Sequence, residues 1–436
     1  MYHAPVSLSG FRGLSDSALR NRVTAALDRL ETVEPRIHAF LPEPDRRRRV
    51  LKDLEELFCR YPNPSSRPGL FGVPVGVKDI FRAEGLETRA GSLLPPETFA
   101  GPEAVSVTRL KNAGALILGK TVTTEFAYFH PGPTRNPWNL EHTPGGSSSG
   151  SAAAVSAGLC PLALGSQTIG SINRPAAFCG ITGFKPSFGR VSREGVVPYS
   201  ASADHVGLLA ADTFSVRAAA EVLLDSWNPL PRPEEGQRKT ILFLEDSYSA
   251  QASEEVLRAV SLTAQRLEDA GIRLKRVSFF KHIKEINDTH RRMTAREFAD
   301  AHQRWFERYS DSYSEVSREL IYLGERIGNE ELKHARAGRF LLREKVGALL
   351  STEGAAALLT PASLSAAPRG LESTGSPLMN LPWTYAGVPT ATLPAAVTPE
   401  GLPLGIQLVG DFGQDEELLE LAGMTESLLP AGKEIL

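Results

Sequence analysis

Residues 145–180 read GGSSSGSAAAVSAGLCPLALGSQTIGSINRPAAFCG. Two glycine-rich loops that carry serines flank an apolar segment at 152–164. Glycine lets a backbone turn sharply and approach a ligand closely, and a serine hydroxyl becomes a nucleophile when a base lies near it. The stretch therefore predicts a helix at 151–158 and a short buried strand at 161–165, with a serine loop on either side as the two walls of a site.

Outside this stretch, apolar runs alternate with helical patterns. Residues 240–244 and 272–279 are typical of strands, and a helical pattern between them stops at Gly271. This β-α-β unit indicates a parallel part of a sheet. Residues 228–239, rich in proline and charge, are the best linker candidate. We predict one large α/β domain over residues 1–436, with a charged helical insertion at 284–350.

Composition excludes several classes of protein. The 436 residues are 42% apolar and 23% charged, as in an ordinary globular protein, and the net charge of −3 gives no reason to expect nucleic-acid binding. The dense basic run 46–49 opens a helical pattern, so we interpret it as a solvated helix face. We expect no membrane segment, because no apolar run approaches transmembrane length.

Cysteine usage and the N-terminus indicate a cytoplasmic protein without a metal. Three cysteines cannot form a disulfide framework, and neither C-x-x-C nor H-E-x-x-H spacing occurs. The first residues lack the apolar core of a signal peptide. We therefore expect a cytoplasmic location, no metal and no organic cofactor.

Lys78 ends an apolar strand pattern at 72–80 and has two interpretations. A lysine there can reach the surface along its own aliphatic stem. Alternatively, burial lowers the pKa of the amine, so that it acts as a base. Position alone favours the surface interpretation, because lysine is rarely buried.

Lys78, Ser147 and Ser171 together change this balance. With the blocks around them, the chain resembles the amidase signature family of serine hydrolases from about residue 15 to its end. The resemblance is densest in 72–79, 120–126, 136–154, 164–186 and 401–410. It implies a mixed, twisted sheet covered by helices on both sides, with residues 60–215 as the signature core.

The resemblance also assigns roles. Ser171 is the implied nucleophile, Ser147 a bridging serine after a cis peptide bond to Gly146, and Lys78 the base. This Ser-cisSer-Lys triad implies an acyl-enzyme and the release of ammonia or an amine from a small amide. A neutral lysine can accept the proton if desolvation lowers its pKa.

The oxyanion hole is expected at Thr168, Ile169, Gly170 and Ser171, whose backbone N–H groups would hold the developing charge. The family usually has two glycines before the nucleophile, and this chain has Ile169 at the first of those positions. Isoleucine keeps its N–H but adds a β-branched side chain and resists positive φ. This leaves open a narrower acyl pocket, or a catalytically impaired binding or scaffold homologue.

Arg174 stands three residues after the expected nucleophile. With Gln167, Ser149 and the pair 383–384, it makes the chain most similar to malonamidase-type members, in which such an arginine pairs with a substrate carboxylate. The alternative is that Arg174 braces its loop through backbone carbonyls. Ser148 and Gly146 complete the expected substrate-binding set.

The expected partner is a small amide molecule, with neither nucleic acid nor membrane. A homodimer remains open, since no local pattern decides it. The rival function is an amidotransferase A-subunit that works in a complex on aminoacyl-tRNA. Phe126, Trp138 and Trp383 have two interpretations, acyl-pocket lining or core packing.

Overall fold

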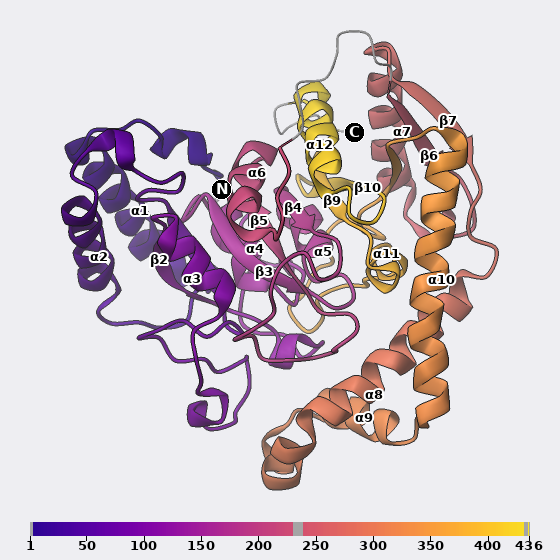
Figure 1. Cartoon of the computed structure of the whole chain (residues 1–436), viewed down its shortest axis with the longest axis horizontal. Helices are drawn as coiled ribbons and strands as arrows, with labels where there is room; N and C mark the ends of the chain where they lie inside the picture. Colours follow the sequence, from indigo (N-terminus) through magenta and orange to yellow (C-terminus); the bar gives the residue numbers. More distant parts are fainter. Residues whose placement is uncertain (1–2, 230–238, 431–434, 436) are drawn as a thin grey trace.

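The apolar runs form the strands of one mixed sheet. The computed structural model describes residues 3–229, 239–430 and 435, so residues 230–238 of the predicted linker lie outside the described residues. Within the described residues the sheet has ten strands in the order β2-β1-β3-β5-β4-β9-β10-β8-β6-β7 (Figure 1). The strands are β1 (Pro74–Lys78), β2 (Leu116–Thr121), β3 (Leu162–Gln167), β4 (Thr182–Lys185), β5 (His205–Ala210), β6 (Thr240–Leu244), β7 (Arg273–Val277), β8 (Ala357–Pro361), β9 (Thr390–Val397) and β10 (Pro403–Val409).

Strand directions bring two predicted site segments together at the carboxyl ends of β1 and β3. β1 pairs in parallel with both β2 and β3. The β6–β7 pair is also parallel, as its β-α-β pattern predicts, and so is the β6–β8 pair. Between these two parallel parts, the neighbours in the order β3-β5-β4-β9-β10-β8 all pair antiparallel. Because β1 and β3 run the same way, Lys78 at the end of β1 and the loop after β3 emerge side by side.

Helices cover both faces of the sheet, as predicted. Successive strand residues point to opposite faces, and β4 shows the consequence. A Cβ on Gly183 would lie 2.6 Å from the Cβ of Ala176 in α5, whereas Thr182 donates to Glu426 of α12 at 3.0 Å. The helices are α1 (Asp16–Ile37), α2 (Arg46–Arg60), α3 (Val105–Asn112), α4 (Ser149–Ser156), α5 (Asn173–Cys179), α6 (Thr213–Leu223), α7 (Glu254–Asp269), α8 (Ile283–Tyr309), α9 (Glu315–Glu325), α10 (Asn329–Glu353), α11 (Leu381–Ala386) and α12 (Asp415–Leu428).

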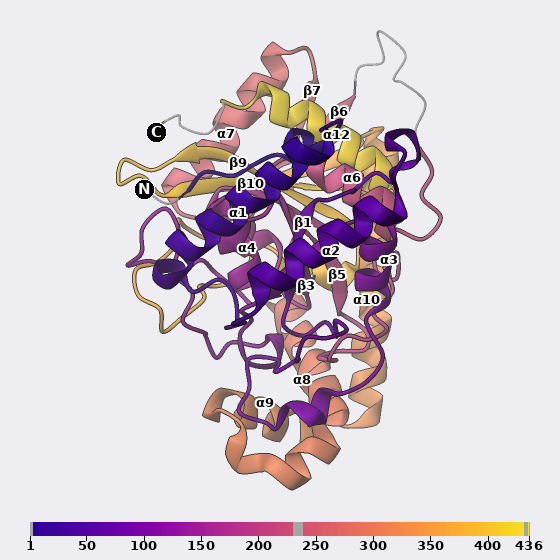
Figure 2. The same cartoon turned by 90° about the vertical axis from the view of Figure 1, so that its left-hand side faces the viewer.

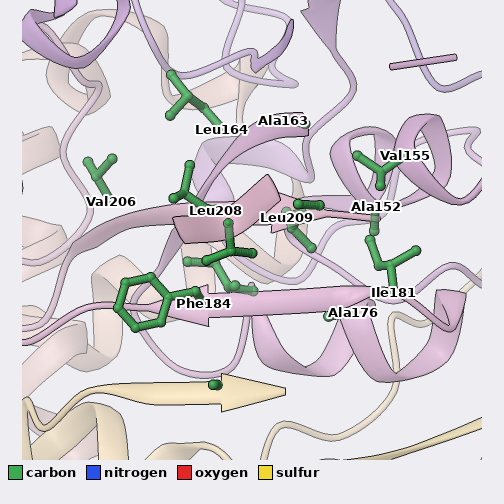
Figure 3. Packing of buried hydrophobic residues seen from close by; sticks show 14 of the residues in the cluster. Ala152, Val155, Ala163, Leu164, Ala176, Ile181, Phe184, Val206, Leu208 and Leu209 are labelled. Carbon is green, nitrogen blue, oxygen red and sulfur yellow. The ribbon is translucent and has the colours of Figure 1, made fainter. Parts of the chain in front are cut away.

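Residues 145–180, the segment with the two serine loops, lie in the core of the molecule. Their α4, β3 and α5 pack with β4 and β5 through small and branched side chains, which keep the helices close to the sheet (Figure 3). The residues labelled there are all buried, and they are Ala152, Val155, Ala163, Leu164, Ala176, Ile181, Phe184, Val206, Leu208 and Leu209. This packing fixes the two serine loops to one rigid unit.

Helices α8, α9 and α10 form the charged helical region. Figures 1 and 2 show α8 and α9 extending away from one end of the sheet. The proposed boundaries of a signature core at 60–215 and an insertion at 284–350 remain predictions. No helix among the described residues has the length and apolarity that a membrane crossing needs.

The basic run at 46–49 differs from the predicted solvated face. Arg46 is 8% exposed and donates to the carbonyl of Leu41, while Arg49 donates to the carbonyls of Ile117 and Leu118. Their helix α2 packs on the edge strand β2. The Arg49 guanidinium therefore meets two carbonyls of this strand, whereas Arg46 turns back to a carbonyl of the segment that precedes α2. The prediction is therefore wrong for these two arginines and holds for Arg48, which is exposed.

Candidate active site

Lys78 lies fully buried at the end of β1. Its Nζ is 2.7 Å from Ser147 Oγ and 2.7 Å from Ser166 Oγ. Ser147 follows a cis peptide bond to Gly146, as the resemblance implies, and Ser166 comes from β3, the parallel neighbour of β1. The surface interpretation of Lys78 is wrong, because the amine ends between two hydroxyl groups.

Burial lowers the pKa of Lys78 well below its ordinary value of 10.5. The carboxylate of Asp204 opposes this shift, and the guanidinium of Arg174 adds to it. Desolvation disfavours the ammonium form, so the site favours a neutral amine with a lone pair.

The carboxylate that follows Lys78 in the sequence is engaged elsewhere. Asp79 Oδ1 lies 2.6 Å from Lys120 Nζ, in an ion pair that is buried on both sides. Its other oxygen accepts from the backbone N–H of Arg89 at 3.1 Å. Asp79 therefore neutralises Lys120 and leaves Lys78 without a carboxylate of its own.

Ser166 is the site residue that sequence reasoning missed. It lies one residue before the end of β3, whereas Lys78 is the last residue of β1. The available signal was a polar residue near the carboxyl end of an apolar strand pattern, next to the predicted turn. Ser148, predicted to bind substrate, instead faces the backbone of Ser166. Its Oγ accepts from the N–H of Ser166 at 3.3 Å and donates to its carbonyl at 3.3 Å, so the serine loop is tied to β3.

The turn after β3 is held by Gln167. Its Oε1 accepts from the backbone N–H groups of Ile172 at 2.8 Å and Asn173 at 3.0 Å, and its Nε2 donates to Thr384 Oγ1 at 2.9 Å. Ser171 at the end of this turn is 7% exposed. No hydrogen bond between described residues uses the N–H groups of residues 168–171 or the Ser171 hydroxyl. Four backbone donors and one hydroxyl therefore remain available at the turn.

Ile169 causes no backbone conflict. Among the described residues it does not belong to the non-glycine positions with positive φ, so the expected resistance of isoleucine to that conformation has no consequence here. Gly170 is the position that tolerates no side chain. A Cβ there would lie 2.6 Å from Asn380 Oδ1 and 2.8 Å from Pro377 Cβ.

Arg174 is 2% exposed and braces two loops. Its Nη1 donates to the carbonyl of Gly375 at 2.5 Å, and its Nη2 donates to the carbonyl of Gly146 at 2.6 Å and to Thr374 Oγ1 at 3.1 Å. Burial lowers its pKa to about 9, and its Nε has no partner among the described residues. The bracing alternative accounts for these contacts, and the Nε–H group remains beyond them.

A cavity of about 500 Å³ opens beside the site. Ser166 and Thr168 contribute to its wall, and Ile80, Val191 and Val206 line much of the rest. The three aromatic residues considered for the acyl pocket do not line this cavity and pack elsewhere. Trp383, for example, is fully buried and donates through Nε1 to Tyr248 Oη at 2.8 Å.

Comparisons with known proteins identify the family of this chain. A model of the amidase family matches residues 21–419. The glutamyl-tRNA(Gln) amidotransferase A-subunit of Prochlorococcus marinus (strain MIT 9211) is 33% identical and is aligned over 93% of this chain and 94% of its own length. A crystal structure of an amidase is 32% identical, with a TM-score of 0.84 over 97% of this chain and 98% of that chain.

A peptide amidase crystallised with the competitive inhibitor chymostatin is 26% identical, with a TM-score of 0.83 over 97% of both chains. The family match spans most of the chain, and the solved structures share its fold. The chain therefore belongs to the amidase family, the amidase signature hydrolases that act on the C–N bonds of amides.

Proposed function

We propose that this protein hydrolyses a small amide through Ser171, Ser147 and Lys78. The observation that carries the proposal is the buried amine of Lys78, 2.7 Å from both Ser147 Oγ and Ser166 Oγ. A serine hydroxyl needs a base to become a nucleophile, and a neutral lysine supplies the lone pair. The chain has such a lysine where two hydroxyl groups meet it.

In the proposed reaction, Ser171 Oγ attacks the amide carbonyl carbon. Its proton passes to Ser147 Oγ as the Ser147 proton passes to Lys78 Nζ. The negative charge that develops on the carbonyl oxygen is held by backbone N–H groups of residues 168–171. Ser166 accepts a hydrogen bond from Lys78 and so keeps the lone pair of the amine directed at Ser147.

The same relay then runs in reverse. Lys78 returns a proton through Ser147 to the leaving nitrogen, the C–N bond breaks, and ammonia or an amine departs. An acyl ester on Ser171 remains. A water molecule, deprotonated by the same relay, cleaves this ester to the carboxylic acid and restores the Ser171 hydroxyl.

Arg174 supports a substrate that carries a carboxylate. Burial alone lowers the pKa of this guanidinium, with no nearby carboxylate to oppose the shift, and Nε lacks a partner among the described residues. A substrate carboxylate would supply the missing countercharge close to Ser171. The two bonds to backbone carbonyls would then hold the guanidinium in place for this contact.

A second candidate is an amidotransferase A-subunit. It is favoured by the 33% identity to the glutamyl-tRNA(Gln) amidotransferase A-subunit over 93% of this chain. The test is to replace that subunit by this chain in the reconstituted enzyme of the relative. Formation of glutaminyl-tRNA would support the amidotransferase, and its absence beside free amide turnover would support the hydrolase.

The cytoplasmic location and a homodimer stay predictions.

A fluorophosphonate probe tests the proposed nucleophile. We expect mass spectrometry to find the modification on Ser171, and expect Lys78→Ala to lose it. Lys185→Met is the matched control, because Lys185 is a second fully buried lysine at the end of a strand. An unmodified Ser171 in the wild type would remove the hydrolase proposal.

A panel of amides tests the carboxylate. Pairs of monoamides with and without a carboxylate on the acyl side are compared by ammonia release. We expect kcat/KM to favour the carboxylate by about tenfold or more, as for a charged hydrogen-bonded contact. Equal turnover, unchanged in Arg174→Lys, would remove the carboxylate from the proposal and leave amide hydrolysis standing.

A further inference from the structure

Three carbonyl groups of the turn that precedes Ser171 are each held by a donor. His290 Nε2 lies 3.0 Å from the carbonyl oxygen of Thr168, Thr384 Oγ1 donates to that of Ile169 at 2.7 Å, and the Arg174 backbone N–H donates to that of Gly170 at 3.0 Å. Each peptide unit is planar and these are trans, so the carbonyl and the next N–H point in opposite directions. Fixing a carbonyl therefore also fixes the N–H that follows it.

His290 is the donor that comes from the helical region. It lies on α8, is fully buried, and has its pKa lowered to about 3 by burial. The ring is therefore neutral at working pH, and Nε2 must carry its hydrogen because the Thr168 carbonyl is an acceptor. Its Nδ1 has no partner among the described residues. This histidine orients the peptide unit whose N–H belongs to Ile169.

Helix α8 also holds the side chain of Thr168, through a loop. Thr168 Oγ1 donates to Asp204 Oδ1 at 2.6 Å. The loop that carries Asp204 is fixed by Glu297 of α8, a buried carboxylate that accepts from Ser200 Oγ at 2.5 Å and from the N–H of Ser202 at 2.8 Å. Main chain and side chain of Thr168 are thus both tied to one helix.

We propose that helix α8 positions the oxyanion turn, with His290 and Glu297 as positioning residues for the reaction at Ser171. The inference rests on the proposed amide hydrolysis. Backbone donors stabilise a transition state only when they already point at the developing charge. In this chain the Ile169 N–H takes its direction from a residue more than a hundred positions downstream, outside the segment that carries the serines.

The decisive variants are His290→Leu, which removes the donor, and His290→Gln, whose side-chain amide can restore an N–H near the position of Nε2. His302→Leu is the matched control. His302 is likewise buried on α8 with its pKa lowered to about 3, but its Nε2 lies 3.2 Å from the carbonyl of Pro198 instead of the oxyanion turn.

Three quantities are measured on the full chain: kcat and KM for amide turnover, the rate constant of Ser171 modification by the fluorophosphonate, and Tm. We expect His290→Leu to lower kcat and the modification rate by about ten- to a hundredfold, the scale of a misplaced reactive geometry, with KM within about twofold. His290→Gln should recover most of this loss, with the pH midpoint of kcat unchanged. His302→Leu should lower Tm and leave kcat within about twofold.

Two results would overturn the inference: a wild-type kcat in folded His290→Leu, or an equal loss of kcat in His302→Leu. In either case, modification of Ser171 in the wild type would still support the hydrolase. An unmodified wild-type Ser171 would overturn both. If His290→Leu does not fold, Glu297→Gln takes its place, because it replaces one acceptor oxygen by a donor and releases a serine of the loop. It should then lower kcat by about tenfold at constant KM, and unchanged kcat would overturn the inference.

Discussion

Lys78 and Lys185 are two lysines in the same local situation with different surroundings. Each is the last residue of a strand, β1 or β4, and each is fully buried. Burial lowers the pKa of both, that of Lys185 to about 7. They differ in the atoms that meet the amine.

Lys78 Nζ meets the hydroxyl groups of Ser147 and Ser166, whereas Lys185 Nζ donates to the backbone carbonyls of Val388 at 2.5 Å and Pro186 at 3.2 Å. A carbonyl oxygen only accepts a hydrogen bond, but a hydroxyl both donates and accepts. A proton can therefore pass from Ser147 to Lys78, and none can reach Lys185 from its partners. Burial lowers the pKa of both amines, and only Lys78 has a neighbouring hydroxyl from which the proposed mechanism can pass a proton.

The largest effect is expected when either of the two buried lysines is replaced by a side chain without an amine. We expect Lys78→Met to lower kcat by about a thousandfold or more, because removing the base of a serine hydrolase costs on that scale. Lys185→Met should keep kcat within about twofold. The measurement is amide turnover at saturating substrate, with Tm as the check on folding. Comparable losses in both variants would show that buried lysines matter here for structure alone.

A smaller effect is expected at the hydroxyl that directs the amine. Ser166→Ala removes one of the two contacts of Lys78 Nζ and leaves Ser147 in place. We expect a loss of about tenfold in kcat, on the scale of one lost hydrogen bond. Ser166→Thr is the control, since it keeps the hydroxyl and should keep most of the activity. Full activity in Ser166→Ala would remove Ser166 from the site.

The smallest expected effect concerns how the free energy of unfolding depends on pH through Lys185. Its folded pKa of about 7 lies below the ordinary 10.5, so between these values the unfolded chain binds more protons than the folded one. The free energy of unfolding should therefore rise with pH across this window by about 1 kcal/mol per pH unit and lose this gain as pH falls through about 7.

Urea unfolding of wild type and Lys185→Met at several pH values between 7 and 10 measures this contribution. The variant should have the flatter dependence, because methionine does not titrate. Identical slopes in the two proteins would mean that Lys185 keeps its charge in the folded state.

Much of the fold followed from local patterns. The β6-α7-β7 unit and the strands β1 and β3 lie where apolar runs between turn residues predict them. The order in which these strands pair could not be predicted from local patterns, because pairing in a mixed sheet depends on residues far apart in the chain. The prediction of a solvated face in α2 was wrong at Arg49 for the same reason, since the partners of this arginine are carbonyls of a strand far along the chain.

For the site, the sequence predicted several of the residues but few of their contacts. Lys78 ends an apolar strand pattern, and the resemblance to a family favoured a base there over a lysine that reaches the surface. Ser166 and His290 were missed, since their importance depends on which atom of another segment they meet. Arg174 stayed between two roles because bracing and carboxylate binding need the same side chain.

The central claim is that Lys78 acts as a neutral base, and the pH dependence of Ser171 modification tests it most directly. The rate constant of fluorophosphonate labelling is measured from acid to alkaline pH in wild type and in Lys185→Met. Because burial lowers the pKa of Lys78, we predict in both proteins a rate that falls on the acid side, with a midpoint well below 10.5. A rate independent of pH, a midpoint near 10.5, or a midpoint that moves in Lys185→Met would contradict the account.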